Sequence, residues 1–402
     1  MSDQAIIDLL RRPGVARILS VLDGAGEETR IVGGAVRNTL LGRPAADVDL
    51  ATTALPEVTM DRAKNAGLKP IPTGIEHGTV TVLAEGVPFE VTTLREDVET
   101  DGRHAVVRFG RDFAADARRR DFTINALSLG RDGQVHDNVG GLADLATKRV
   151  RFVGSARQRI REDYLRLLRF FRFHAEYGEG EIDPDGLSAA VGEREGLAIL
   201  SAERVRAEFL KLLAARRATE TIALLSETGL LQRLVAGVGE VGRLARAARF
   251  DTAKPDPVLR LAALLVASEE DAIRLRERLR LSNSENDRLT NFAKALARLR
   301  SAEVIDAPEM RRLAFSFGIP PLIECLAVLE GEPRPALSAD GEQLRRRYEA
   351  GQEDAPVFPL SGRELVAQGI SPGPDLGRRL AEARDAWLKA GCPQDWRPIS
   401  SD

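Results

Sequence analysis

Two aspartates separated by one residue, in the stretch "AADVDLAT", are the side chains of this sequence best suited to hold a metal ion. On a β-strand, residues i and i+2 point to the same face, so Asp47 and Asp49 would present two carboxylates while Val48 faces the core. Carboxylate oxygens are ligands for Mg²⁺, which could activate an attacking hydroxyl and hold a triphosphate. The same pattern is also common on solvated surfaces without any chemical role.

A third carboxylate, Glu90, lies in "PFEVTT", where it alternates with the apolar Phe89 and Val91. It could complete the metal site if its strand lies beside the strand that carries the two aspartates. A solvated sheet face explains the same alternation equally well.

A glycine pair, Gly33 and Gly34, stands between a short apolar run and a helical pattern in "RIVGGAVRNTLLG". Glycines let a phosphate approach the backbone, and the free N–H groups at a helix N-terminus favour anions. Arg37, in the first turn of that helix, can add a charged fork. Packing alone also produces such turns, but a glycine pair followed closely by an aspartate pair is much rarer by chance.

A basic run, Arg118–Arg120, precedes Asp121 and the mostly apolar stretch "FTINALSL". The run could face a triphosphate or the backbone of a nucleic-acid acceptor, and Asn125 could exchange hydrogen bonds near a reacting sugar. A cationic helix start with an Arg–Asp surface pair explains the run better when it is taken alone.

The stretch "EDYLRLLRFFRF", residues 162–173, predicts a helix in which Arg166, Arg169 and Arg172 form one stripe and Asp163 stands three residues ahead of them. Side chains at i and i+3 of a helix are neighbours, so Asp163 and Arg166 can present an acceptor and a donor together. A salt bridge on a solvated helix is the alternative reading of this pair.

These stretches lie in a chain that changes character near residue 150. Before that point, short runs with strand character alternate with turns and two helical patterns, and "EGVP" predicts a hairpin turn. After residue 155, apolar stripes with a helical period dominate, and one long helical pattern ends at Gly178. The pattern therefore predicts an α/β head followed by an all-α remainder.

Composition and charge restrict the class of protein. The net charge is −3, yet residues 101–172 contain 15 Arg and one Lys against eight Asp and one Glu, a net charge of +7. Such a band suggests a local site for a polyanion, although arginines with intramolecular partners explain it equally well. Two distant cysteines, Cys325 and Cys392, and the lack of a long apolar run or signal peptide favour a cytoplasmic protein without a membrane segment.

Four stretches occur in the order and at the spacing of one known family: "GGAVRNTLLGRPAADVDLAT", "RRDFTINAL", "EDYLRLLRFFRF" and "SAERVRAEFLKLL". They resemble the successive motifs of the class II tRNA nucleotidyltransferases, the CCA-adding enzymes, to which bacterial poly(A) polymerases are close relatives. The resemblance implies a nucleotidyltransferase head with a small mixed sheet over residues 1–145. It also implies neck helices that recognise the nucleotide over 146–215, and a helical body and tail that bind tRNA over 216–402.

The resemblance implies a reaction as well. Enzymes of this family add C, C and A to the 3′ end of tRNA from CTP and ATP, with Mg²⁺ and without a nucleic-acid template. Asp163 and Arg166 would read the base, because a carboxylate accepts from the exocyclic amine that cytosine and adenine share. The candidate catalytic carboxylates are Asp47, Asp49 and Glu90, the first two as Mg²⁺ ligands. The residues expected at the nucleotide are Gly33, Gly34, Arg37, Arg120, Asn125, Asp163, Arg166, Arg169 and Arg172.

One residue departs from the family pattern. The first motif usually reads GGxVRD, and Asn38 stands here in place of the Asp. An ion pair made by that carboxylate would be absent, while a hydrogen-bonding role could survive.

Alternative functions remain open at this point. The polar stretch 95–110 is present at full length, which favours complete C-C-A addition over partial CC or A addition. A bacterial poly(A) polymerase is the main alternative, although "PTGIEHGTV" stands where those enzymes carry a "GRRF"-like signature. A non-enzymatic helical RNA-binding protein conflicts with the intact Asp47 and Asp49 pair. We expect no obligate protein partner.

Overall fold

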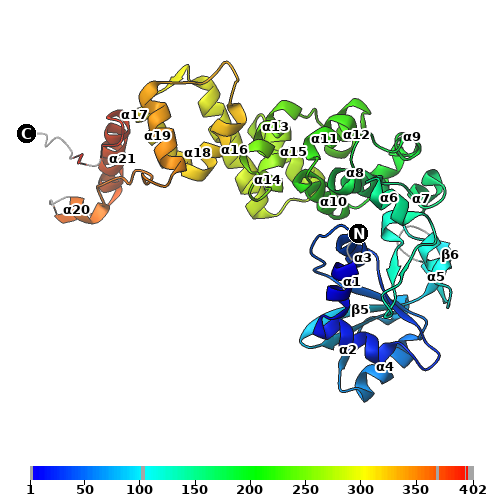
Figure 1. The fold of residues 1–402 in the computed structure, drawn as a ribbon. Coiled ribbons are helices and arrows are strands. Elements are labelled where there is room, and N and C mark those ends of the chain that lie inside the picture. The colour runs from blue at the N-terminus through cyan, green and yellow to red at the C-terminus, as the bar shows by residue number, and fades with distance from the viewer. Residues whose placement is uncertain (1–2, 101–104, 368–370, 394, 397–402) are drawn as a thin grey trace, which may run out of the picture. The chain divides into compact units, whose positions relative to one another are not determined.

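The computed structural model of the chain describes residues 3–100, 105–367, 371–393, 395 and 396 (Figure 1). It forms two compact units, Met1–Glu208 and Phe209–Asp402. The division into head, neck and body with tail stays a prediction, and the predicted head and most of the predicted neck fall within the first unit.

The first unit is built around a seven-stranded mixed sheet with the strand order β3-β4-β5-β2-β1-β8-β9. β2 and β5 are parallel, and the other neighbouring strands are antiparallel. This sheet confirms the predicted α/β head. Its strands are β1 (Thr29–Val32), β2 (Asp49–Thr52), β3 (Lys69–Gly74), β4 (Thr79–Ala84), β5 (Val87–Thr93), β8 (Ser128–Leu129) and β9 (Val135–His136).

The turn between β4 and β5 has two residues, Glu85 and Gly86, with φ of 51° and 75°. Positive φ at both central residues is the type I′ geometry that matches the twist of a hairpin, so the predicted turn is confirmed. Farther along, β6 (Arg95–Thr100) and β7 (Ala105–Phe109) form a separate antiparallel pair. The predicted polar stretch 95–110 is therefore mostly strand, and its residues 101–104 lie outside the described part of the chain.

Helices surround this sheet, and α2 and α4 pack against its strands (Figure 1). The short 3₁₀ helix η2 (Thr123–Asn125) leads into β8. The α-helices of the first unit are α1 (Asp3–Leu10), α2 (Pro13–Leu22), α3 (Gly34–Leu40), α4 (Pro56–Asn65), α5 (Phe113–Arg118), α6 (Gly141–Ala146), α7 (Ala156–Glu162), α8 (Leu165–Tyr177), α9 (Pro184–Gly192) and the first half of α10 (Ala202–Ala214). The remaining 3₁₀ helices are η1 (Ile75–His77) and η3 (Arg194–Ile199).

The predicted single helix over residues 162–173 is wrong, because the chain breaks between α7 and α8. Asp163 is extended, with φ −155° and ψ 107°. Its side-chain Oδ1 accepts from the backbone N of Leu165 at 3.1 Å, and its carbonyl accepts from the N of Arg166 at 2.9 Å. Aspartate side chains compete with the helix for backbone N–H groups, so Asp163 ends one helix and begins the next. α8 then runs to Gly178, as predicted.

Aromatic side chains fix α8 against the head. The ring centroid of Phe122 lies 4.9 Å from those of Phe152 and Phe173, and Phe152 lies 5.1 Å from Phe170. All four rings are buried, and such tilted aromatic pairs add to the free energy gained by burial. One face of α8 is therefore anchored in the core, while its arginines face the polar side.

The second unit is helical apart from a two-stranded pair, β10 (Val304–Ile305) and β11 (Ala336–Leu337), in its described residues. Near its end, the ring of Trp387 is 1% exposed and packs 5.1 Å from Phe315 and 5.3 Å from Phe358. Its helices are α11 (Ala218–Glu227), α12 (Leu230–Val235), α13 (Val241–Phe250), α14 (Pro257–Leu265), α15 (Glu269–Leu279), α16 (Asn283–Ser301), α17 (Ala307–Phe317), α18 (Ile319–Leu329), α19 (Ala339–Glu349), α20 (Gly362–Ala367) and α21 (Pro374–Lys389).

Within the described residues, no single helix has the length and apolar character needed to cross a membrane. Only α17 and α18 taken together, which are bent by 120° at their junction, meet those two criteria.

Candidate active site

The three candidate catalytic carboxylates lie on one face of the sheet. Asp47, Asp49 and Glu90 are exposed, whereas Val48 and Val91 are buried. Asp47 lies just before β2, and Asp49 is its first residue. The parallel register of β2 and β5, which pairs the residues following Asp49 and Glu90, sets these two side by side. The structure thus brings the three predicted carboxylates together.

The neighbouring carboxylates perturb Asp49 electrostatically. Partial burial, followed by the negative charges of Glu90 and Asp47, raises the pKa of Asp49, while Arg120 acts in the opposite direction. Like charges held together favour a bound cation, because a cation relieves their repulsion. The same observation identifies Arg120 as the arginine that acts on the carboxylate face.

Two carboxylates suit a divalent ion that shares its coordination with a substrate. In the part of the chain that the structure describes, no group of three or more His, Cys, Asp or Glu side chains is gathered closely enough to hold a metal ion. Mg²⁺ is usually bound by one or two carboxylates plus waters and substrate phosphates, which the pair Asp47 and Asp49 can provide. Glu90 influences Asp49 but does not complete a preformed three-carboxylate site.

The glycine pair forms a turn that two arginines approach closely. Gly33 has φ +66°, which favours glycine, and a Cβ added there would lie 3.1 Å from Nη1 of Arg120. A Cβ at Gly34 would lie 3.6 Å from Nη2 of Arg37. The turn lies at the start of α3. Because two guanidinium groups lie so close to it, the turn is a positively charged position with little free space.

Arg37 is buried, with 6% of its surface exposed, and donates to three neutral side chains. Nη1 donates to Oδ1 of Asn125 at 2.5 Å, and Nη2 donates to the hydroxyl of Tyr177 at 2.7 Å. Nη2 and Nε also donate to Oδ1 of Asn38 at 2.9 and 3.1 Å. The hydrogen-bonding role expected for Asn38 is therefore present, without an ion pair.

Arg120 is fixed by a buried acid rather than by a surface pair. Its Nε and Nη2 donate to Oδ2 of Asp116 at 3.1 Å, and its Nη1 donates to the carbonyl of Asn125 at 3.3 Å. Arg119 donates to the other oxygen of Asp116. Although burial opposes ionisation, Arg120 and Arg119 hold the pKa of Asp116 below its ordinary value. The aspartate thus orients Arg120 toward the glycine turn.

Asp121 joins the arginines of α8 to the head. Arg169 donates from Nε and Nη2 to Oδ2 of Asp121 at 2.9 and 2.7 Å, and Asn125 donates to its Oδ1 at 2.9 Å. Burial opposes ionisation of Asp121, but Arg169 and Asn125 hold its pKa below the ordinary value. On the next turn of α8, Arg172 donates to Glu208 at 2.6 Å. A continuous polar network therefore links α8 to Asn125 and through it to Arg37.

Asp163 and Arg166 do not pair with each other in this structure. Oδ2 of Asp163 accepts from Arg204 of α10 at 2.7 Å. Nη1 of Arg166 donates to Glu162 at 2.6 Å. The alternative reading of an i, i+3 salt bridge on a single helix is wrong, because the chain breaks at Asp163 and each side chain takes a different partner.

A cavity of about 700 Å³ opens on the carboxylates away from the glycine turn. In the strand order, the turn lies on the β1 and β8 side of β2, whereas the cavity extends over β5 and β4. Its rim carries the exposed Arg12, Pro13, Val87 and Pro88. Nη1 of Arg12 donates to the carbonyl of Ala45 at 2.6 Å, and none of the described acids forms an ion pair with it.

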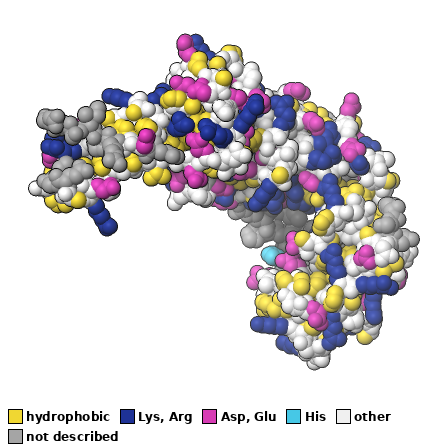
Figure 2. Space-filling model, turned by 60° about the vertical axis from the view of Figure 1, so that its left-hand side comes forward, with side chains coloured by type: hydrophobic (Ala, Val, Ile, Leu, Met, Phe, Trp, Pro, Cys, Tyr) yellow, Lys and Arg dark blue, Asp and Glu magenta, His cyan; other side chains and the backbone are white. Residues whose placement is uncertain are grey.

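The basic band predicted from composition is largely balanced by acids. On the face shown in Figure 2, Lys and Arg side chains are interspersed with Asp and Glu. Several acids come from outside the band, including Glu27, Asp183, Glu193 and Glu208. The intramolecular reading therefore accounts for most of the band. Its arginines that form ion pairs include Arg111, Arg118, Arg119, Arg120, Arg149, Arg151, Arg157, Arg159, Arg161, Arg166, Arg169 and Arg172.

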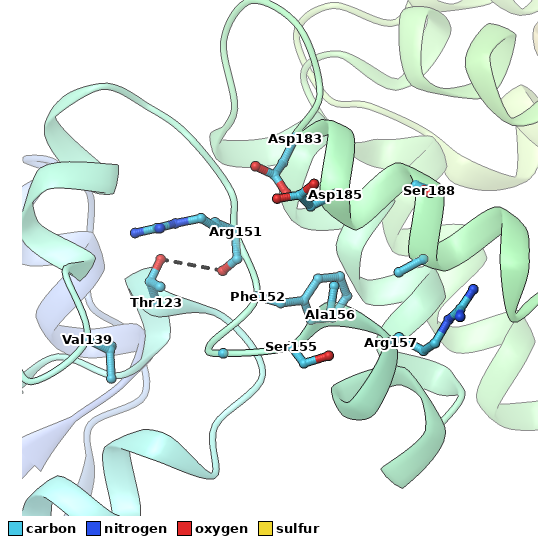
Figure 3. Close-up of a pocket in the computed structure, with 12 residues that line it drawn as sticks. Thr123, Val139, Arg151, Phe152, Ser155, Ala156, Arg157, Asp183, Asp185 and Ser188 are labelled. Carbon is cyan, nitrogen blue, oxygen red and sulfur yellow. Dashed lines mark hydrogen bonds between the residues drawn. The ribbon is translucent and has the colours of Figure 1, made fainter.

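A second pocket in the first unit, of about 620 Å³, lies outside this site (Figure 3). Figure 3 shows Asp183 and Asp185 on one wall, with Arg151 and Arg157 on opposite sides. Asp183 is paired with Arg149 and caps α9, Arg151 is paired with Asp144, and Arg157 with Glu193. Asp183, Arg151 and Arg157 of this pocket are thus engaged in internal pairs.

Sequence reasoning missed several residues of this site. Asp116, Tyr177 and Arg204 fix candidate residues, and the last two do so from positions remote in the sequence. The run "DARRRD" contains Asp116 at i, i+4 from Arg120, which is a local signal for that pair. Tyr177 and Arg204 have no comparable local signal, because their partners lie on other elements.

The chain is similar to known proteins over most of its length. A family model of the poly A polymerase head domain matches residues 29–151, and a model of the probable RNA- and SrmB-binding site of polymerase A matches residues 181–238. The mitochondrial CCA tRNA nucleotidyltransferase 1 of Mus musculus is 36% identical over 391 residues, which cover 94% of this chain and 87% of that protein.

A bacterial relative and a solved structure are similar over comparable spans. The CCA-adding enzyme of Leuconostoc citreum is 33% identical over 380 residues, 92% of this chain and 91% of that protein. The CCA-adding enzyme of Bacillus stearothermophilus, solved in complex with CTP, superimposes with a TM-score of 0.69 and 29% identity over 94% of each chain.

Proposed function

The chain belongs to the family of the CCA tRNA nucleotidyltransferases, the CCA-adding enzymes, and we propose that it adds C, C and A to the 3′ end of tRNA from CTP and ATP. The observation that carries this proposal is the exposed pair Asp47 and Asp49, which lies between a turn lined by arginines and an open cavity. A metal held by this pair could orient two substrates, one on each side.

In the proposed reaction, the terminal ribose hydroxyl of tRNA attacks the α-phosphate of the incoming nucleotide, and pyrophosphate leaves. Asp47 and Asp49 would hold Mg²⁺. When bound, this ion would lower the pKa of the attacking hydroxyl and neutralise charge on the phosphates. Arg37 and Arg120, at the glycine turn, would bind the triphosphate. Burial is the main cause of the raised pKa of Asp49, and the repulsion by Glu90 and Asp47 that adds to it supports a cation at this pair.

Base recognition is assigned to Asp163 and Arg166 at the start of α8. A carboxylate accepts from the exocyclic amine of cytosine or adenine, and a guanidinium donates to a ring nitrogen or carbonyl. Asp163 accepts from Arg204, and Arg166 donates to Glu162 and to the carbonyls of Arg159 and Arg119. These bonds use only part of the capacity of the two side chains, since each carboxylate oxygen accepts more than one bond and Arg carries five donors. The two side chains can therefore be oriented by these partners and still meet a base.

The cavity beside the carboxylates would receive the end of the tRNA. In an in-line displacement, the attacking and leaving oxygens lie on opposite sides of the phosphorus. With the triphosphate at the glycine turn, the attacking ribose would approach from the β5 and β4 side, where the cavity opens. Arg12 can meet the acceptor backbone, while Pro13, Val87 and Pro88 can pack against a base or sugar.

The proposal is tested by incubating the purified protein with Mg²⁺, CTP, ATP and a tRNA that ends at the discriminator base, then sequencing the 3′ ends. Ends that stop at CCA are expected. Ends that stop at CC would indicate a partial activity, and long A tails would indicate a poly(A) polymerase. No extension by the wild type, with a known CCA-adding enzyme active in parallel, would overturn the proposal.

We also propose a cytoplasmic location. Both cysteines, Cys325 and Cys392, are free and buried, as in a protein that needs no oxidising compartment.

A further inference from the structure

Arg37 differs from its neighbours in having no acid to balance its charge. Among the described residues, no carboxylate lies within ion-pairing distance of its guanidinium, and its three side-chain partners are neutral. Arginine stays protonated in proteins, so a buried positive charge remains here. By contrast, Arg120, Arg169 and Arg172 are each paired with an acid.

A buried charge without a counter-ion lowers stability unless it meets other favourable contacts. The nearest acid in the polar network, Asp121, is paired with Arg169 and reaches Arg37 only through Asn125. Burial lowers the pKa of Arg37, and the positive charges of Arg172 and Arg169 act in the same direction, while Tyr177 and Asp121 act against them. An anion bound at the adjacent glycine turn would remove this imbalance.

Asn38 is oriented so that it accepts from Arg37. Its Nδ2 donates to the carbonyl of Pro44 at 3.3 Å, which leaves Oδ1 facing the guanidinium. Pro44 belongs to the segment that leads to Asp47. The amide thus connects Arg37 to the approach of the carboxylate pair without adding negative charge.

Tyr177, the last residue of α8, contacts Arg37 in two ways. Its hydroxyl accepts from Nη2, and its ring lies 4.0 Å from the guanidinium carbon. The same ring lies 5.0 Å from the guanidinium carbon of Arg43, which also pairs with Glu176 at 2.5 Å. Aromatic faces attract cations without neutralising them. The end of α8 therefore holds both α3 and the segment that follows it.

We infer that Tyr177 is a positioning residue for nucleotide binding, which holds Arg37 beside the glycine turn with its charge uncompensated, so that this charge binds the phosphates of CTP and ATP. The inference rests on the proposed function, because it takes a nucleoside triphosphate as the ligand of the turn. Since Arg37 would contact phosphates and not the base, Tyr177 contributes equally to both nucleotides.

The test is direct binding of CTP, ATP and inorganic pyrophosphate to the full-length protein with Mg²⁺, measured by calorimetry without tRNA. Tyr177→Phe keeps the ring and removes the hydroxyl. Because a hydrogen bond to a charged group is lost, the Kd of each of the three ligands is expected to rise by about tenfold. Unchanged binding of any of the three ligands would overturn the inference. If only some of the ligands bound more weakly, Tyr177 would act through the base, and if none did, Tyr177 would have no role in binding.

Tyr348→Phe is the matched control for this substitution. The Tyr348 hydroxyl is buried in the second unit without a hydrogen-bond partner, and its pKa is raised to about 12, chiefly by burial. Removal of that hydroxyl should leave nucleotide binding unchanged. If wild-type protein binds CTP and extends tRNA while Tyr177→Phe matches it, only the role of Tyr177 fails. If wild type does neither, the proposed function itself fails.

A second variant separates positioning from general stability. Asn38→Asp replaces the amide oxygen that already accepts from Arg37 by a carboxylate, which gives the guanidinium a stronger anchor. In that background, Tyr177→Phe is expected to weaken CTP binding by less than about threefold, because the two anchors are coupled. The same loss in both backgrounds would mean that Tyr177 acts on folding rather than on Arg37, and would overturn the inference.

Discussion

The two sides of the carboxylate face are built differently. Around the glycine turn, side chains are fixed by a continuous polar network that runs from α8 to Arg37. On the other side of β2, the cavity has an exposed apolar rim and Arg12, which has a single carbonyl partner. The difference matches the two substrates of the proposed reaction. The triphosphate has the same shape in every addition, whereas the acceptor ends in a new nucleotide after each one.

The largest effect is expected at the boundary between the two sides. Asp49→Ala should lower kcat by about a thousandfold, because a lost metal ligand removes several kcal/mol of charge stabilisation. Single-turnover incorporation of CTP measures this. Asp61→Ala, an exposed acid on α4, is the control and should retain full activity. Turnover retained by Asp49→Ala would contradict the metal assignment.

Asp49→Ala should not lower stability. A raised pKa in the folded state means that ionisation of Asp49 costs stability as the pH rises through its ordinary value of about 3.9. The variant lacks this cost, so at neutral pH its free energy of unfolding should equal or exceed that of the wild type. Urea unfolding at pH 7 tests the sign.

A second prediction concerns the polar network that fixes the side chains around the glycine turn. Arg169→Ala should lower the free energy of unfolding by roughly 2 kcal/mol, less than for a fully buried pair because the arginine is partly exposed. The pKa of Asp121 is lowered, so its contribution is full above its unfolded value and disappears as the pH falls through the folded value. The difference between variant and wild type should therefore shrink in acid.

Urea unfolding at pH 7 and at strongly acidic pH measures this difference. Arg378→Ala, which breaks an exposed pair on α21, is the control and should change nothing measurable. A difference for Arg169→Ala that does not depend on pH would mean that the arginine stabilises by packing alone.

A third prediction concerns the cavity on the other side of β2. Val87→Asp and Arg12→Glu should each raise KM for tRNA by about tenfold, because they place negative charge where the acceptor phosphates would lie. KM for CTP should not change. Arg17→Glu is the matched control, since Arg17 on α2 also donates to one backbone carbonyl but lies outside the cavity. A rise in KM for CTP instead would place the nucleotide in the cavity.

The smallest effect is expected at Arg204. Arg204→Ala removes a half-exposed partner of Asp163, whose carboxylate is still oriented by the N–H of Leu165. The ratio kcat/KM for CTP and for ATP should fall by about threefold or less. Primer-extension assays with each nucleotide measure this. A much larger loss for one nucleotide alone would mean that Arg204 takes part in base selection.

Features set by local pattern could be predicted from the sequence. The alternation around Asp47, Asp49 and Glu90 follows from the two-residue period of strands, and the turn at Glu85 and Gly86 follows from residue type. The helix break at Asp163 could not be predicted from periodicity, because apolar residues keep a helical spacing through it. A capping side chain and an extended backbone interrupt the helix without interrupting that spacing.

Hydrogen-bond partners that lie on other elements could not be predicted from the sequence either. Asp163 meets Arg204 and Arg37 meets Tyr177 across separations of 41 and 140 residues. Nothing in a single sequence pairs such residues, since many arginines compete for each acid. The strand pattern placed the three carboxylates on one face of the sheet, as the structure has them, but it did not reveal what orients the cations.

The placement of Trp387 has an optical consequence. The sequence contains two tryptophans, Trp387 and Trp396, and both belong to the last part of the second unit. Ring packing against Phe315 and Phe358 makes the emission of Trp387 a reporter of that end of the chain. Selectively excited tryptophan fluorescence will therefore not report on the first unit, while circular dichroism reports on both units. Denaturation followed by the two signals would show whether the units melt together or apart.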